Sequence, residues 1–280
     1  MAWHARLALQ YERLGAADAP RTVARFLHEG PLRILQSLHP EGPGICHNVL
    51  VHPPSGLVAG DRLDISIDVA AGAHGVITTP GAGRFYRSEG ERATQHVKAR
   101  LQEGARLEWL PMEAICYSGC NAENRLDLAL APGAECIGWD VTALGLPASS
   151  QPFVAGRLRQ HLEVAGGWLE RGMIDAGDGR LMDSPLGLAG RRCIATLFLA
   201  TGSDIGRERR EQALALAREV IEAHPLRACA GATAPDGRTV AVRVLSDVVE
   251  PAMELLKAVR NAWRPGLWGL APNPPRTWAL

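Results

Sequence analysis

The cysteines carry the most reactive side chains of this sequence, but their spacing completes no familiar site. Cys116 and Cys120 form a C-x-x-x-C unit, and Cys46 precedes His47. A structural zinc site needs four ligands, and no second pair of Cys or His stands at a matching distance. A redox pair usually has the spacing C-x-x-C. We therefore expect reduced cysteines that serve as small structural residues.

The segment HPPSGLVAGDRLDI (52–65) holds a second set of candidate groups. His52 and Asp61 are residue types that act in acid–base catalysis or bind metals. The sequence offers no nucleophile with a neighbouring base to complete a catalytic set. A structural turn leading into a strand explains the same residues.

The segment TTPGAGRFYRS (78–88) has the glycines and arginines of a phosphate-binding loop. It lacks the lysine and the helix start of a P-loop, and its spacing does not fit G-x-G-x-x-G. Aromatic and guanidinium groups are enriched at protein interfaces. We therefore predict a partner surface formed by Arg84, Phe85, Tyr86 and Arg87.

Strands must position these groups over the first 200 residues. Leu63, Ile65, Ile67 and Val69 alternate with polar residues, the period of a half-buried strand. Similar strands end at turns with the sequences AAGA (70–73), EGA (103–105), PGA (132–134) and AGG (165–167).

The repeat of these turns, at Gly72, Gly104, Gly133 and Gly166, predicts the fold. Glycine supplies the positive φ of a hairpin or bulge, and one hairpin cannot bury both of its faces. We predict a mainly β fold, an elongated, solenoid-like stack of β-hairpin or strand repeats with two C-terminal α-helices. A β-sandwich with evenly spaced turns remains an alternative.

The pattern changes to helices near residue 203. Ser203 is predicted to cap a helix that runs through Arg207 and Ile221 and stops at Pro225. Residues 239–245 read as a strand. A second helix is predicted at Pro251–Trp263, with an apolar stripe that we assign to a second partner interface; it contains Leu255, Leu256 and Val259. We expect a single domain over residues 1–280, with a β-rich body at 1–202 and a helix-containing part at 203–280.

Composition excludes several classes of protein. The 30 basic and 30 acidic residues give a formal net charge of zero, which disfavours nucleic-acid partners. The first residues lack the apolar stretch of about 7–15 residues found in signal peptides. The longest charge-free apolar run, Cys193–Ser203, is too short for a membrane span of about 20 residues. We expect a cytoplasmic protein without a membrane partner.

Several separated blocks closely resemble the urease accessory proteins of the UreD (or UreH) family. The resemblance covers almost the whole chain in the same order. The blocks are GPLRILQSLHPEGPGICHNVLVHPPSGLVAGDRLDI (30–65), GAHGVITTPGAGRFYRS (72–88), LEWLPMEAI (107–115), PGAECIGWDVTALGLPAS (132–149) and PRTWAL (275–280).

This resemblance implies a maturation factor that is not an enzyme. Members of the family are mainly β proteins that bind the accessory protein UreF. The pair recruits the GTPase UreG and docks on the urease apoprotein to assist nickel insertion. No permanently bound cofactor is expected, only transient Ni²⁺. The alternative is a small cytosolic enzyme that uses the Asp61 and Arg84 loops on a phosphorylated or carboxylated metabolite.

A metal in transit needs ligands that bind and release it, and isolated carboxylates suit this better than a closed Cys/His cage. Glu113, Asp140 and Asp175 stand at odd offsets of 9, 7 and 9 residues from their turn glycines, so they would share one strand face. Cys136 stands at offset 3. We therefore predict a transient nickel path along these four residues, while solvated strand ends would explain the same acids.

Overall fold

The strands of this chain form two sheets, and each repeat contributes a strand to both. A computed structural model describes residues 2–15, 19–54 and 56–279. The seven-stranded sheet has the order β15-β14-β11-β8-β5-β1-β2. Its strands are β1 (His4–Leu14), β2 (Arg21–Glu29), β5 (Arg62–Val69), β8 (Ala93–Leu101), β11 (Cys120–Leu130), β14 (Gly156–Val164) and β15 (Leu169–Asp175).

The eleven-stranded sheet follows the path β17-β18-β16-β12-β9-β6-β4-β3, with the short strands β7, β10 and β13 beside it. Its strands are β3 (Arg33–Leu38), β4 (Ile45–Val51), β6 (His74–Thr78), β7 (Gly83–Phe85), β9 (Arg106–Leu110), β10 (Ala114–Cys116), β12 (Glu135–Leu146), β13 (Gln151–Pro152), β16 (Cys193–Thr201), β17 (Ala230–Thr233) and β18 (Thr239–Ser246).

Three successive repeats form a parallel β-solenoid, and the two sheets are its walls. Strands β5, β8 and β11 belong to the seven-stranded sheet and lead into β6, β9 and β12 of the other sheet. Each strand pairs in parallel with its equivalent in the next repeat, so that Ile65 lies opposite Val97 and Val97 opposite Leu126. The predicted mainly β, solenoid-like fold is confirmed, with about four turns.

The four predicted glycine turns share one conformation, but only one of them is a hairpin. The φ angles of Gly72, Gly104, Gly133 and Gly166 lie between 65° and 73°. Each glycine is the third residue of a turn closed by a backbone hydrogen bond, a position where positive φ favours glycine. The first three turns cross between the sheets as arches, whereas the turn at Gly166 joins the antiparallel strands β14 and β15. The expected stack of hairpins is therefore corrected to a stack of arches closed by one hairpin.

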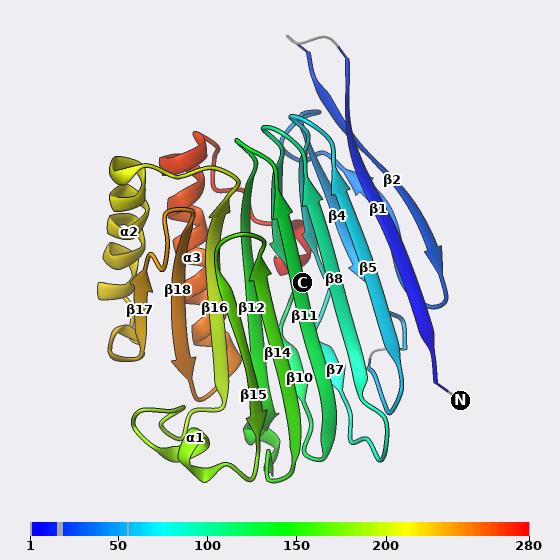
Figure 1. Cartoon of the computed structure of the whole chain (residues 1–280), viewed down its shortest axis with the longest axis vertical. Coiled ribbons are helices and arrows are strands. Elements are labelled where there is room, and N and C mark those ends of the chain that lie inside the picture. Colours follow the sequence, from blue (N-terminus) through cyan, green and yellow to red (C-terminus); the bar gives the residue numbers. More distant parts are fainter. Residues whose placement is uncertain (1, 16–18, 55, 280) are drawn as a thin grey trace.

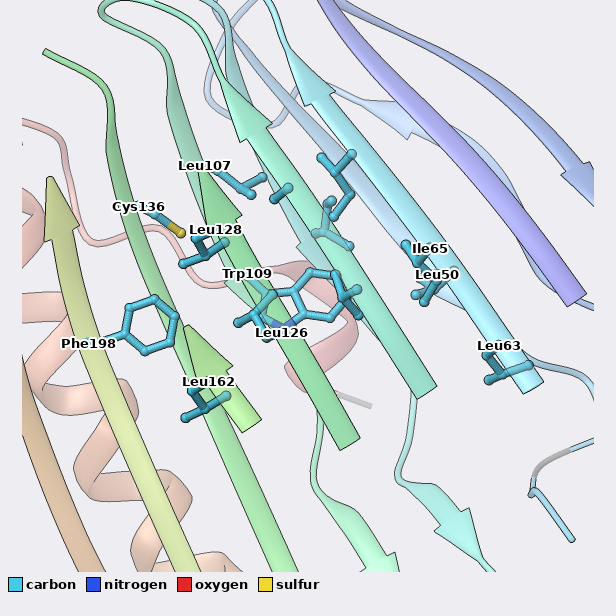
Figure 2. Packing of buried hydrophobic residues seen from close by; sticks show 14 of the residues in the cluster. Leu50, Leu63, Ile65, Leu107, Trp109, Leu126, Leu128, Cys136, Leu162 and Phe198 are labelled. Atoms are coloured by element: carbon cyan, nitrogen blue, oxygen red, sulfur yellow. The ribbon is translucent and has the colours of Figure 1, made fainter. Parts of the chain in front are cut away.

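The main core lies between the two sheets, because every second side chain of each strand points inward. Figure 2 shows Trp109, Leu126, Leu162 and Phe198 gathered in this core, with two of them from each sheet. All four side chains are buried. At about 25 cal/mol per Å² of apolar surface removed from water, such burial is the main stabilising contribution to the solenoid.

Two helices cover the outer face of the eleven-stranded sheet at one side of the molecule (Figure 1). Their apolar stripes and the strands beneath them make a second core. The α-helices are α1 (Gly179–Asp183), α2 (Arg207–Glu222) and α3 (Val249–Trp268). The short 3-10 helices are η1 (Pro147–Ser149), η2 (Arg227–Cys229) and η3 (Arg276–Ala279).

Both C-terminal helices were predicted, but their ends differ from the prediction. Helix α2 begins after Gly206, and Ser203 instead accepts a hydrogen bond from the Gly133 amide at 3.2 Å. Helix α3 continues past Trp263 and ends before Gly269, whose φ of 65° suits the end of a helix. The strand predicted at 239–245 is β18. Within the described residues, none of the helices has the length and apolar character that crossing a bilayer requires.

Candidate functional site

A carboxylate with polar partners lies inside the apolar core of the solenoid. Asp140 of β12 points between the sheets and is only 8 % exposed. Asn124 Nδ2 of the facing strand β11 donates to Asp140 Oδ2 at 2.6 Å, and Gln160 Nε2 of β14 donates to Oδ1. Gln95 Nε2 of β8 donates to Asn124 Oδ1 at 3.2 Å. The amides of Asn124 and Gln160 therefore contact the buried acid directly, and Gln95 contacts Asn124.

Burial sets the proton affinity of this acid. It raises the pKa of Asp140 to about 6, although hydrogen bonds from Gln160, Thr142 and Asn124 act in the opposite direction. The negative charge of Glu170 also raises this pKa. Asp140 therefore carries a charge at neutral pH and can exchange a proton for a cation close to physiological pH.

Asp140 lines a cavity of about 60 Å³ together with Asn124, Gln95 and Glu113. A larger cavity of about 290 Å³ adjoins it and shares Gln95 and Arg84. Glu113 also lines a third cavity of about 200 Å³, whose wall includes the exposed Asp247. Two of the predicted carboxylates thus meet at one cavity, and Glu113 stands between that cavity and the edge of the molecule.

The other two predicted metal ligands lie elsewhere. Cys136 shares the inward face of β12 with Asp140, but four residues of strand separate them by about 13 Å. Burial raises the pKa of the Cys136 thiol far above its usual value. Asp175 ends β15 in the opposite sheet, and its Oδ1 accepts a hydrogen bond from the Gly177 amide at 2.9 Å. The shared strand face that the offsets predicted is therefore wrong for Asp175, because β14 and β15 form a hairpin instead of an arch.

The C-x-x-x-C unit is part of the same interior. Cys116 and Cys120 are both buried, and all six cysteines are free thiols. A hydrogen bond between the two thiols raises the pKa of Cys116 and lowers that of Cys120. The prediction of small structural cysteines fits this placement.

The structural interpretation of the 52–65 segment also fits. Asp61 Oδ1 accepts a hydrogen bond from the Trp3 amide at 2.8 Å, and Oδ2 accepts one from the Val58 amide at 2.9 Å. Both oxygens of this buried carboxylate therefore hold backbone in place. The acid that the enzyme alternative invoked is thus engaged with the local backbone.

The predicted partner surface at residues 84–87 is only partly on the outside. Arg87 is exposed and Arg84 and Tyr86 are half-buried, but Phe85 is a core residue of β7 with 2 % exposure. Tyr86 packs against Tyr117, with ring centroids 4.8 Å apart. The prediction is therefore wrong for Phe85, because its side chain faces inward.

The predicted helical interface is wrong in this structure. Leu255, Leu256 and Val259 of α3 are fully buried against the eleven-stranded sheet and α2. The apolar stripe was correctly identified, but this chain's own strands cover it. A partner cannot contact these three side chains while α3 remains in place.

Sequence reasoning missed a buried ionic cluster beneath α3. Glu108 of β9 and Arg260 and Arg264 of α3 are all fully buried. Arg260 Nη2 lies 2.6 Å from Glu108 Oε2, and Arg264 Nη2 lies 2.7 Å from Glu41 Oε2. His74 Nε2 lies 3.3 Å from Glu108 Oε1. These charges fix α3 on the sheet, and the only available signal was a pair of arginines one helical turn apart beside an apolar stripe.

Comparison with known proteins agrees with the fold and the resemblance. The family model described as "UreD urease accessory protein" matches residues 4–279. The chain is 66% identical over 280 residues to a protein of Paracidovorax citrulli named "Urease accessory protein UreD", with both chains fully covered.

Proteins of the same name from two other organisms are similarly close. The protein of Polaromonas naphthalenivorans is 62% identical over 280 residues, and that of Variovorax paradoxus is 63% identical over 279 residues. Both alignments cover the whole of each chain. This chain therefore belongs to the family of UreD urease accessory proteins.

Proposed function

We propose that this protein assists urease maturation by guiding Ni²⁺ through the space between its two sheets. The observation that carries the proposal is the buried Asp140, which faces an internal cavity and accepts hydrogen bonds from the side-chain amides of Asn124 and Gln160. Glu113 lines that cavity and a second one nearer the edge. Two carboxylates bind a borderline divalent cation without enclosing it, so that the ion can leave again.

In this proposal the chain acts in the cytoplasm as a single domain over 1–280, without a permanently bound cofactor. Its partners are a UreF-type accessory protein, a UreG-type GTPase and the urease apoprotein. GTP hydrolysis belongs to the GTPase, because this sequence has no phosphate-binding loop. The family name supports an accessory role, and no reaction is assigned to this chain.

Replacing the cavity carboxylates should impair nickel delivery. We expect Asp140→Asn combined with Glu113→Gln to lower urease activation and urease nickel content by about tenfold or more, as loss of metal-site groups commonly does. Both substitutions keep the size of the side chain. The measurement is urease activity and nickel content after co-expression with the urease operon.

Asp175→Asn is the matched control, because Asp175 lies in the other sheet and outside the cavity. It should activate urease like the parent. Co-purification of the accessory proteins must be unchanged in every variant. Full activation by the double variant would remove the two carboxylates from the nickel path.

The raised pKa of Asp140 also predicts a pH-dependent stability. The folded state holds this proton more tightly than the unfolded chain, whose carboxyl has the ordinary value of 3.8. The contribution of the Asp140 proton to stability is therefore fully present below about pH 4 and is lost as the pH rises through about 6. At pH 8 the ionised form costs about 3 kcal/mol, which Asp140→Asn removes.

Urea denaturation at pH 8 and pH 5 measures this effect. Asp140→Asn should be more stable than the parent by up to about 3 kcal/mol at pH 8, and the gap should shrink by about half at pH 5. A gap that does not change with pH would contradict the assigned pKa. This outcome is independent of any role in nickel transfer.

A further inference from the structure

A group of side chains of the types that ligate metals lies on the outer face of the seven-stranded sheet. Asp127 of β11 stands directly opposite Glu163 of β14 in the parallel register. His161 lies two residues before Glu163, so all three side chains share one face. Asn124, which reaches Asp140 on the inner face of β11, has the opposite parity to Asp127. The sheet itself therefore separates this group from the internal cavity.

The donor atoms lie close enough together to contact one ion after small side-chain adjustments. One atom each from Asp127, His161 and Glu163 lies within 4.8 Å of the others. His161 Nε2 is 3.4 Å from Asp127 Oδ1 and 2.8 Å from Glu163 Oε2. Ligands bonded to one ion at about 2.1 Å stand about 3.0–3.4 Å apart in octahedral or tetrahedral sites. An imidazole with two carboxylates suits a borderline divalent cation such as Ni²⁺ or Zn²⁺.

Neighbouring side chains hold these donors in position. The His161 side chain is only 7% exposed, which restricts its orientation, whereas 39% of the Glu163 side chain is open to solvent. His96 Nε2 of β8 contacts the other oxygen of Asp127 at 2.6 Å. The remaining oxygen of Asp127, Oδ1, is directed to His161.

Arg125 is the group that a cation must displace. Its Nε donates to both oxygens of Asp127, at 2.8 and 2.9 Å, and its side chain is 37% exposed. A guanidinium in this place neutralises the carboxylates, and its exposure leaves room for it to move aside. Arg125 thus makes the site weaker and readily exchangeable.

We propose that Asp127, His161 and Glu163 form an exchangeable site for Ni²⁺ or Zn²⁺ on the outer face of the seven-stranded sheet. His96 is a positioning residue for Asp127, and Arg125 competes with the metal. This site is distinct from the internal cavity, and its existence does not depend on the proposed nickel path.

The experiment titrates the purified full-length chain with NiCl₂ and, separately, with ZnCl₂ in a calorimeter. His161→Gln should weaken one binding event by about 10- to 100-fold. Arg125→Gln should tighten the same event by about fivefold, because it removes a cation close to the metal. A purely structural ion-pair network would not produce opposite effects from these two variants.

Two controls make the assignment specific. His4→Gln removes a similar imidazole–carboxylate pair on the same sheet, 2.7 Å from Asp64, and should leave the binding unchanged. Asp140→Asn tests the internal cavity and should leave this event intact even if urease activation falls. Circular dichroism checks that each variant is folded. Equal metal affinity of the parent and His161→Gln, or weaker binding by Arg125→Gln, would overturn the proposal.

Discussion

Replacing Glu108 by glutamine should lower the free energy of unfolding by about 3–5 kcal/mol. Glu108 is the shared anion of Arg260 and Arg264, and all three side chains are fully buried. Glutamine keeps the shape of the side chain but leaves two guanidinium groups without this countercharge inside the protein. The loss measured by urea denaturation is therefore the cost of unpaired buried cations, not the net value of the ion pairs.

The pH dependence gives an independent check of this cluster. Burial would raise the pKa of Glu108, but the contact with His74 and the charges of Arg260 and Arg264 hold it at about 2. The contribution of Glu108 is present above its unfolded value of 4.5 and is lost as the pH falls towards 2. The difference in free energy of unfolding between Glu108→Gln and the parent should therefore disappear in this acidic range.

An exposed ion pair is the control for this prediction. Glu29 lies 3.5 Å from Arg6 with 72% of its side chain exposed, and Glu29→Gln should change stability by less than about 1 kcal/mol. If Glu108→Gln were as stable as Glu29→Gln at neutral pH, the ionic cluster would not hold α3 to the sheet.

Replacing Leu256 by aspartate should unfold the helical side of the molecule. Leu256 is fully buried, and truncation of a buried leucine alone costs about 2–5 kcal/mol. Aspartate adds the penalty of a buried carboxylate without a partner, so we expect a total above about 5 kcal/mol. The measurements are the urea midpoint and the yield of undegraded protein.

Leu35→Asp provides a matched control, because Leu35 is 71% exposed. It should leave stability within about 0.5 kcal/mol of the parent. A folded Leu256→Asp variant that fails only to bind a partner would restore the interface interpretation of the α3 stripe.

The repeat could be predicted from the sequence, but its geometry could not. Alternation at Leu63, Ile65, Ile67 and Val69 identifies a strand with one buried face, and the turn glycines mark the strand ends. The turns at Gly133 and Gly166 have the same φ of 73°, yet one is an arch and the other a hairpin. The choice depends on which neighbouring strand is available for pairing, a property of the whole stack.

The burial of charged residues could not be predicted from the local sequence pattern either. Glu108 alternates with Leu107 and Trp109 like a solvent-facing residue of a strand. Glu108 lies on the face of β9 that points out of the solenoid, and α3 covers this face. The α3 stripe was predicted from its own spacing, but a stripe does not reveal which surface covers it, and this explains the mistaken interface at Leu255 and Leu256. The sequence signal for a buried acid was clearer at Asp140 than at Glu108. Asp140 occupies an inward position of its strand, where its side chain cannot reach solvent.

The ionic cluster beneath α3 can form only late in synthesis, because its arginines belong to the last α-helix. Neighbouring coils of the solenoid pair segments about 30 residues apart, so each coil can form on the preceding one as the chain leaves the ribosome. The partner of Glu108, Arg260, is translated 152 residues later. The partner of Glu41, Arg264, is translated 223 residues later. Until α3 has been translated, two carboxylates and the apolar strands around them lie open to water. Because exposed apolar strands favour aggregation in general, the outer face of the eleven-stranded sheet depends on the last α-helix for its cover.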